Sequence, residues 1–116
     1  MEYNLEERTT RFSEVVIQFC KKIPYSEITK PIINQLIRSA TSIGANYCEA
    51  DEAESKKDFR HKIGICKKEA RETKYWLRLI GNMIAEEMKP EARKFWVEAK
   101  ELTLIFNAII NSKKNT

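Results

Sequence analysis

The chain has 116 residues, of which 42% are hydrophobic and 33% are charged, and its formal net charge is +4. This length fits one domain around one core and excludes a separate cofactor domain. Only three glycines and three prolines occur, which excludes a β-rich fold with many tight turns. We therefore expect a single all-α domain over residues 1–116, with a basic surface that suits a polyanionic partner.

The cysteines Cys20, Cys48 and Cys66 are odd in number and far apart, and the chain begins with neither a basic segment nor an apolar signal core. No uncharged apolar run approaches the ~20 residues that a membrane-spanning helix needs. These features predict a cytoplasmic protein that does not enter a membrane. Because the cysteines lack C-x-x-C spacing, we expect three small buried hydrophobic side chains and no zinc site.

Apolar residues recur at alternating steps of three and four in four successive segments, which is the spacing of helices packed in a bundle. The predicted helices cover about residues 5–22, 30–51, 56–88 and 91–111. Pro24 ends the first helix, Ser55 caps the third, and Pro90 lies in the first turn of the fourth. Because the connections are short, we expect an antiparallel up-down-up-down four-helix bundle.

The third predicted helix carries three stripes. Its core stripe runs from Phe59 to Ile84. A basic stripe beside it, interrupted only by Gly64, consists of Lys57, Arg60, Lys67, Arg71, Lys74 and Arg78. The opposite flank is too apolar for a face that meets only water. Its members, which we call the apolar flank and regard as a candidate interface, are Ile65, Trp76, Leu79 and Met83.

The basic stripe predicts a nucleic-acid partner, because its cations span about 31 Å of helix and can follow a phosphate backbone. Such binding of RNA or DNA should be indifferent to sequence, since contacts to phosphates carry no base information. No aromatic residue interrupts the stripe to stack on bases, which disfavours sequence-specific readout of single strands. In the alternative interpretation the stripe is only solvated, and the protein is a scaffold or accessory subunit that binds a protein partner.

A polar line on the second helix faces acidic positions of the third. We call these residues the polar seam: Arg38, Ser39, Ser42, Asn46, Glu49, Glu69 and Glu72. Pairing around a turn near residue 53 places Arg38 near Glu69 and Ser42 opposite Gly64. We interpret the line as hydrogen-bonded side chains that fix helix register, with a ligand cleft as the alternative. Gly44 and Gly64 are expected to allow close helix packing.

Two E-x-x-E pairs, formed by Glu49 with Glu52 and Glu69 with Glu72, resemble those that all-helical nucleotide pyrophosphohydrolases gather around magnesium. This activity is a remote alternative, because Glu49 is expected opposite Lys57, ~18 Å along the helix from Glu69. We find no phosphate-binding loop, nucleophile elbow or cysteine–histidine pair. We therefore expect no enzymatic activity, no metal and no cofactor.

Residues 38–50, RSATSIGANYCEA, and residues 62–80, KIGICKKEARETKYWLRLI, resemble two blocks of the four-helix bundle proteins known as 23S rRNA intervening-sequence proteins. The resemblance covers about residues 5–110 and implies a bacterial protein without an established enzymatic activity. That family is similar to the accessory variability protein of diversity-generating retroelements, a pentameric barrel that binds nucleic acid and a reverse transcriptase. The resemblance therefore implies a homopentamer, with the apolar flank as our candidate for its interface.

Overall fold

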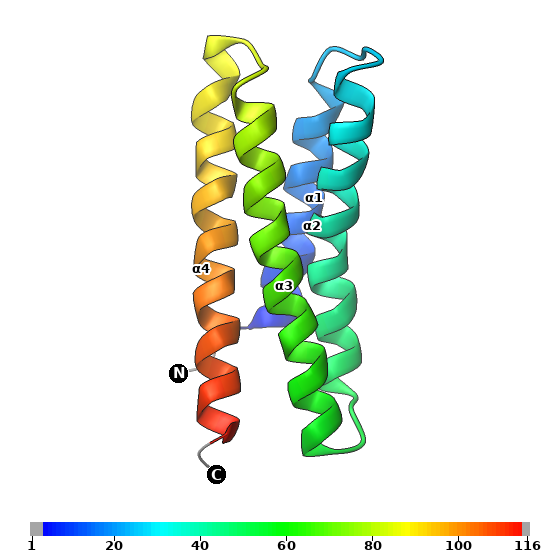
Figure 1. Ribbon diagram of the computed structural model, residues 1–116, viewed down its shortest axis with the longest axis vertical. Coiled ribbons are helices and arrows are strands. Elements are labelled where there is room, and N and C mark those ends of the chain that lie inside the picture. The colour runs from blue at the N-terminus through cyan, green and yellow to red at the C-terminus, as the bar shows by residue number, and fades with distance from the viewer. Residues whose placement is uncertain (1–3, 115–116) are drawn as a thin grey trace.

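The computed structural model describes the backbone of residues 4–114 and the side chains of residues 4–112, so the ends of the predicted domain lie outside the described residues. The described chain forms the helices α1 (Leu5–Lys21), α2 (Thr29–Asp51), α3 (Lys56–Gly81) and α4 (Lys89–Lys114). Figure 1 shows each helix running opposite to the one before it. The fold is an all-α bundle of four helices, as predicted, and the alternating directions are consistent with the predicted topology.

The core is built from the predicted apolar stripes. Phe19 of α1, Leu36 of α2 and Phe106 of α4 are fully buried, and the α3 stripe is buried from Ile63 to Ile80. Burying one large apolar side chain contributes about 1.5–3 kcal/mol. The four stripes together therefore supply the main stabilisation of the bundle. None of the described helices is apolar enough over a sufficient length to cross a membrane.

The prediction that the third helix extends to residue 88 is wrong, because α3 ends at Gly81. The N–H groups of Asn82 and Met83 bond to carbonyls three residues back, which closes the last turn. A 3₁₀ turn, Glu86–Met88, then leads into α4. Glycine disfavours the helix by about 1 kcal/mol relative to alanine. Ile84 is nevertheless buried, so a loop residue continued the apolar spacing and imitated a longer helix.

Hydroxyl side chains accept hydrogen bonds from backbone N–H groups where α2 and α3 begin. Ser55 Oγ accepts a hydrogen bond from Asp58 N at 3.0 Å, as the sequence predicts. Before α2, Ser26 Oγ accepts from Thr29 N at 3.0 Å, and Thr29 Oγ1 accepts from Ser26 N at 2.9 Å. Such reciprocal bonds satisfy N–H groups that have no partner inside the helix. The caps therefore fix the points at which the chain reverses.

The three cysteines are free thiols in different surroundings. Cys20 and Cys66 are buried, whereas Cys48 is exposed. Burial raises the pKa of the Cys20 thiol to about 11 and that of Cys66 to about 12, because a thiolate loses its hydration in the core. Cys66 Sγ instead donates to Ile43 O at 3.5 Å. The expectation of three small buried side chains therefore holds for Cys20 and Cys66 and is wrong for Cys48.

The two mid-helix glycines differ in what surrounds them. A Cβ on Gly44 would lie 3.2 Å from Thr9 Oγ1, so this glycine allows α1 and α2 to pack closely. A Cβ on Gly64 would meet no atom within 4 Å. The close packing predicted for Gly64 is therefore wrong, because its Cβ position faces open space.

The substitution Gly64→Ala should raise the free energy of unfolding by up to about 1 kcal/mol, because alanine favours the helix and its Cβ meets open space. Thermal unfolding followed by circular dichroism measures the effect as a higher Tm. Gly44→Ala is the matched control and should gain less or lose stability, since Thr9 must move. Equal gains in the two variants would contradict the packing described for Gly44.

Candidate nucleic-acid interface

The seam between α3 and α4 carries two facing lines of side chains. We call them together the α3–α4 basic face: Lys67, Arg71, Lys74 and Arg78 on α3, and Lys89, Arg93, Trp96 and Lys100 on α4. Lys67 Nζ donates to Asn107 Oδ1 at 2.8 Å, and Lys74 Nζ lies 5.4 Å from the centroid of the Trp96 ring. These two contacts fix the register in which the lines meet.

The acidic residues of α4 turn away from this face and toward α1. Glu98 accepts hydrogen bonds of 2.8 and 2.7 Å from the guanidinium of Arg8. Nearer the start of α4, Lys22 Nζ lies 2.5 Å from Glu91. The carboxylates therefore neutralise cations of α1 and leave the opposite side of α4 positive.

Three arginines of the basic face have no partner within residues 4–112. Arg71, Arg78 and Arg93 are exposed and make neither an ion pair nor a hydrogen bond with a described side chain. Among the lysines of the face, Lys67 bonds the uncharged Asn107, and Lys89 pairs with Glu86 of the 3₁₀ turn at 3.0 Å. Neighbouring like charges without counter-charges produce a positive potential that attracts anions.

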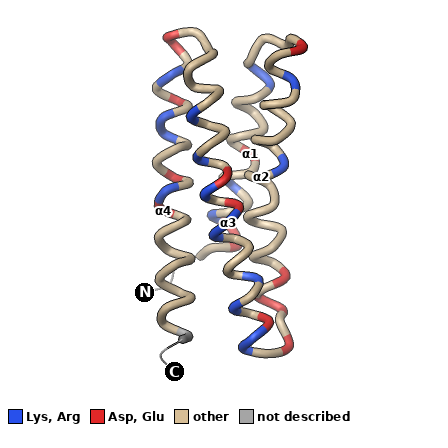
Figure 2. The backbone as a smooth tube through the Cα atoms, in the orientation of Figure 1, with Lys and Arg blue, Asp and Glu red and all other residues tan. Residues whose placement is uncertain are grey.

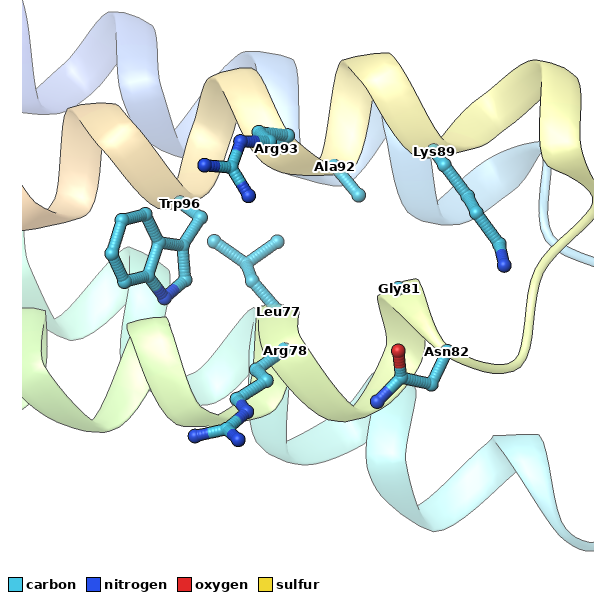
Figure 3. Close-up of a pocket in the computed structure, with 8 residues that line it drawn as sticks. All are labelled: Leu77, Arg78, Gly81, Asn82, Lys89, Ala92, Arg93 and Trp96. Atoms are coloured by element: carbon cyan, nitrogen blue, oxygen red, sulfur yellow. The ribbon is translucent and has the colours of Figure 1, made fainter.

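A pocket of about 320 Å³ lies within the basic face and is lined by Leu77, Arg78, Gly81, Asn82, Lys89, Ala92, Arg93 and Trp96. Figure 3 shows Leu77 pointing from α3 toward Ala92 and Trp96 of α4, whereas the side chain of Arg78 extends away from α4. Leu77 and Ala92 are buried, so part of the lining is apolar, and Trp96 is half-buried. The pocket thus combines an aromatic ring, an apolar surface and several cations.

The predicted basic stripe is divided by the structure. Its members in the basic face are Lys67, Arg71, Lys74 and Arg78. Lys57 and Arg60 lie in the first two turns of α3, beside a connection that contains the exposed residues Glu52 and Glu54. Figure 2 shows acidic and basic segments mixed at this end of the bundle. The structure therefore does not bring Lys57 and Arg60 into the face that lacks acids.

Half of the basic face comes from α4, and this half was not predicted from the sequence. Lys89, Arg93, Trp96 and Lys100 follow one another at steps of four, three and four, which places them on one side of a helix. The spacing indicates that these residues share one side of a helix. Only the register of α4 against α3 shows that this side adjoins the basic stripe. Trp96 thereby becomes the aromatic neighbour that the stripe itself lacks.

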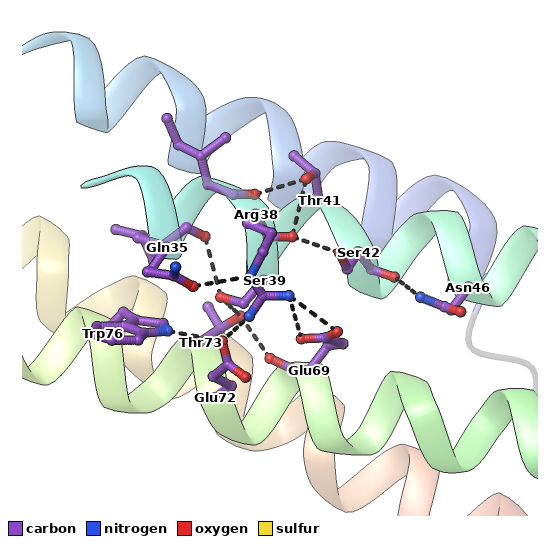
Figure 4. Close-up of polar contacts among 12 residues, drawn as sticks. Gln35, Arg38, Ser39, Thr41, Ser42, Asn46, Glu69, Glu72, Thr73 and Trp76 are labelled. Atoms are coloured by element: carbon purple, nitrogen blue, oxygen red, sulfur yellow. Dashed lines mark hydrogen bonds and ion pairs between the residues drawn. The ribbon is translucent and has the colours of Figure 1, made fainter. Parts of the chain in front are cut away.

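Arg38 of α2 is the centre of the polar seam (Figure 4). Its Nη1 lies 3.3 Å from both carboxylate oxygens of Glu69, which confirms the predicted neighbourhood of these two residues. Its Nη2 pairs with Glu72, whose Oε2 also accepts from Trp76 Nε1 at 3.0 Å. Because Glu69 is only 9% exposed, its carboxylate depends on this guanidinium for compensation of its lost hydration.

The remaining polar positions of α2 are used within the protein. The hydroxyls of Ser39 and Thr73 lie 2.8 Å apart in the core. Ser42 Oγ donates to Arg38 O at 2.6 Å, and Asn46 Nδ2 donates to Ser42 O at 2.8 Å, so both bond their own helix. Every buried side-chain nitrogen or oxygen among the described residues has a partner. These contacts favour the interpretation as a seam that fixes register over that as a ligand cleft.

Glu49 is placed differently from the expectation. It bonds Lys62 Nζ at 2.6 Å instead of lying opposite Lys57, because the pairing of α2 with α3 is centred later in the chain than residue 53. Glu49 is therefore about 10 Å along the helix axis from Glu69, not 18 Å. The carboxylates still serve as ion-pair partners, and no group of three or more metal-ligating side chains gathers in the described chain.

The apolar flank lies on the other side of α3. Ile65, Trp76 and Leu79 are half-buried. Met83 is 41% exposed and belongs to the turn after α3, so it does not continue the helical line as expected. Tyr75 is also exposed and packs edge-on against Trp76 with ring centroids 5.0 Å apart. The flank thus has an accessible aromatic and thioether surface at one end of α3.

Comparisons with known proteins agree with the fold. A model of the family described as 23S rRNA-intervening sequence protein matches residues 2–108. Among solved structures, the chain is similar to a protein of unknown function from the S23 ribosomal protein family of Bacteroides thetaiotaomicron. The sequence identity is 30%, the TM-score is 0.77, and the match covers 90% of this chain and 96% of that one. No protein of curated function matches the chain.

Replacing Arg38 with alanine should lower the free energy of unfolding by about 1–3 kcal/mol, because the nearly buried Glu69 carboxylate loses its partner. Urea unfolding followed by circular dichroism gives this difference. Lys62→Ala is the matched control, since its partner Glu49 is exposed and a surface ion pair contributes at most about 1 kcal/mol. A loss no larger for Arg38→Ala than for Lys62→Ala would contradict the central role of Arg38.

Proposed function

The chain belongs to the 23S rRNA-intervening sequence protein family, and from this premise and its surface we propose that it is a non-enzymatic protein that binds nucleic acid through the α3–α4 basic face. The observation that carries the proposal is that the acidic and the basic side chains lie at different contacts between helices. The acids of α4 pair with α1, Glu69 and Glu72 of α3 pair with Arg38 of α2, and the cations between α3 and α4 remain together. A polyanion is the partner that complements such a surface.

The dimensions of the face suit a phosphate backbone. From Lys67 to Arg78 the α3 line extends for about 17 Å, at 1.5 Å per residue. One nucleic-acid strand in a duplex presents a phosphate about every 3.4 Å, so about five phosphates match that length. Charged contacts of this kind position the nucleic acid but carry no base information. We therefore propose binding that is indifferent to sequence, with RNA as the favoured partner.

Three arginines of the face can make such contacts without losing another ion pair. Arg71, Arg78 and Arg93 pair with no described carboxylate, so binding breaks no existing ion pair at these positions. A guanidinium can donate two parallel hydrogen bonds to a phosphate. We also infer that the protein acts in the cytoplasm, because its three free thiols suit a reducing compartment.

Neutralising the three arginines should weaken binding and reduce its dependence on salt. We expect the variant with Arg71→Gln, Arg78→Gln and Arg93→Gln to show a plot of log K against log salt with a slope smaller by about 2, since each single-strand phosphate contact contributes about 0.7. Fluorescence anisotropy of labelled single- and double-stranded RNA and DNA, at low and moderate salt, measures this slope.

The control for that experiment changes the same number of charges elsewhere. Arg11, Lys21 and Lys30 lie on α1 and α2 and are exposed, and the triple glutamine variant at these positions has the same net charge. Its slope should stay close to that of the unchanged protein. Equal effects in the two variants would show that only net charge matters. Absence of any binding at low salt would refute the proposed function.

Assembly through the apolar flank is the second candidate function, in which the protein is a scaffold or accessory subunit. It is favoured by the exposure of Met83 and Tyr75 beside the half-buried Trp76. By resemblance to the accessory variability protein of diversity-generating retroelements, we propose five copies. A ring of five would also present five basic faces, and such multivalency strengthens weak binding.

A charge at Met83 tests this assembly without disturbing the core. Met83→Asp should reduce the native mass, measured by light scattering after size exclusion, because it places a carboxylate in an apolar contact. Leu104→Asp is the matched control, since Leu104 is 60% exposed on α4 outside the flank, and it should leave the mass unchanged. An assembled protein whose mass is unaffected by Met83→Asp would remove the flank as the interface.

A further inference from the structure

Trp96 is the aromatic side chain of the basic face, and it lies where the pocket between α3 and α4 opens among cations. Lys74 Nζ from α3 and Lys100 Nζ from α4 lie 5.4 and 5.7 Å from the centroid of its ring. The ring is half-buried, so one part is held by the bundle and another part is accessible. A planar apolar surface surrounded by positive charge is the combination by which proteins bind single-stranded nucleic acid.

The lining of the pocket extends this combination. Leu77 and Ala92 supply buried apolar carbon, and Asn82 supplies an exposed amide that can both donate and accept hydrogen bonds. Arg78 of α3 and Arg93 of α4 both line the pocket, and their guanidinium groups lie on either side of Trp96 (Figure 3). Its volume of about 320 Å³ equals that of about ten water molecules, which is enough room for one nucleobase.

We propose that this pocket takes one unpaired base of a single-stranded nucleic acid, which stacks on Trp96 while Arg78 and Arg93 bind the adjoining phosphates. The inference rests on the proposed function and adds a substrate class to it. A duplex keeps its bases stacked inside and presents no free ring to the pocket. A polyanion without bases satisfies the cations but leaves the ring of Trp96 unused. The occupant that uses both features is a single strand.

The lysines over Trp96 do not prevent stacking. A cation over an exposed aromatic ring contributes a factor of about two to five in an equilibrium constant, whereas stacking of a base contributes about five- to 150-fold. Stacking is therefore at least as favourable as one such contact, and a base can replace a lysine on one ring face. A displaced lysine remains within reach of a phosphate of the same strand, so its charge still contributes to binding. Because every base has a stacking face, the pocket should tolerate all four bases.

The test compares a labelled single-stranded oligonucleotide with an abasic strand of the same length, and thus separates bases from phosphates. We expect the unchanged protein to bind the strand with bases at least about fivefold more tightly. Trp96→Leu should remove this difference, which is read as the ratio of the two affinities in the same variant, so that a general weakening of the basic face cancels. A circular dichroism spectrum like that of the unchanged protein, together with remaining salt-dependent binding of the abasic strand, shows that the variant is folded.

A second variant, Trp96→Phe, keeps a smaller ring and should retain part of the preference for bases. Loss of binding to both strands by Trp96→Leu, with the preference fully kept by Trp96→Phe, would overturn the stacking role. Equal affinity of the unchanged protein for the two strands would overturn the inference and leave the proposed function intact. Absence of binding to either strand would instead refute the proposed function itself. Tighter binding of a duplex with the same number of phosphates would also overturn the inference.

Discussion

The guanidinium of Arg38 holds two carboxylates of α3 against α2, and the arrangement of the bundle depends on this ion pair. Glu69 sits at the edge of the core, where an unpaired charge would be costly. Any slip of α3 along α2 would separate Glu69 and Glu72 from Arg38 and would also part the hydroxyls of Ser39 and Thr73. The apolar stripes alone would tolerate a shift by one turn, because leucine, isoleucine and alanine recur at the same spacing.

The rotation of α3 follows from the same contact. With its acidic side held against α2, the helix must direct its basic side toward α4, whose own acids are occupied by Arg8 and Lys22 of α1. The surface between α3 and α4 is thus positive as a consequence of how the other seams are closed. One rotation of α3 about its axis therefore serves two purposes. It places the acids of α3 against Arg38 of α2, and it places the cations of the proposed nucleic-acid face beside α4.

The four helices and their core could be predicted because periodic apolar residues report burial directly. The end of α3 could not, since Ile84 continues that period from a loop. The basic side of α3 was also visible, but its completion by Trp96 was not, because residues of different helices meet only through register. A displacement of the pairing centre by two or three residues suffices to move Glu49 from Lys57 to Lys62. Local patterns thus identify faces, whereas ion pairs and hydrogen bonds between helices decide which faces meet.

Different residues stabilise the bundle and supply its positive surface, which affects how this protein can change during evolution. Residues that stabilise the bundle, such as Arg38 and Glu69, are distinct from the exposed arginines Arg71, Arg78 and Arg93, which pair with no described side chain. Substitutions at the arginines are therefore nearly neutral for folding. Selection can strengthen, weaken or abolish the positive surface by single steps, and related proteins can keep the same bundle while their ligands diverge.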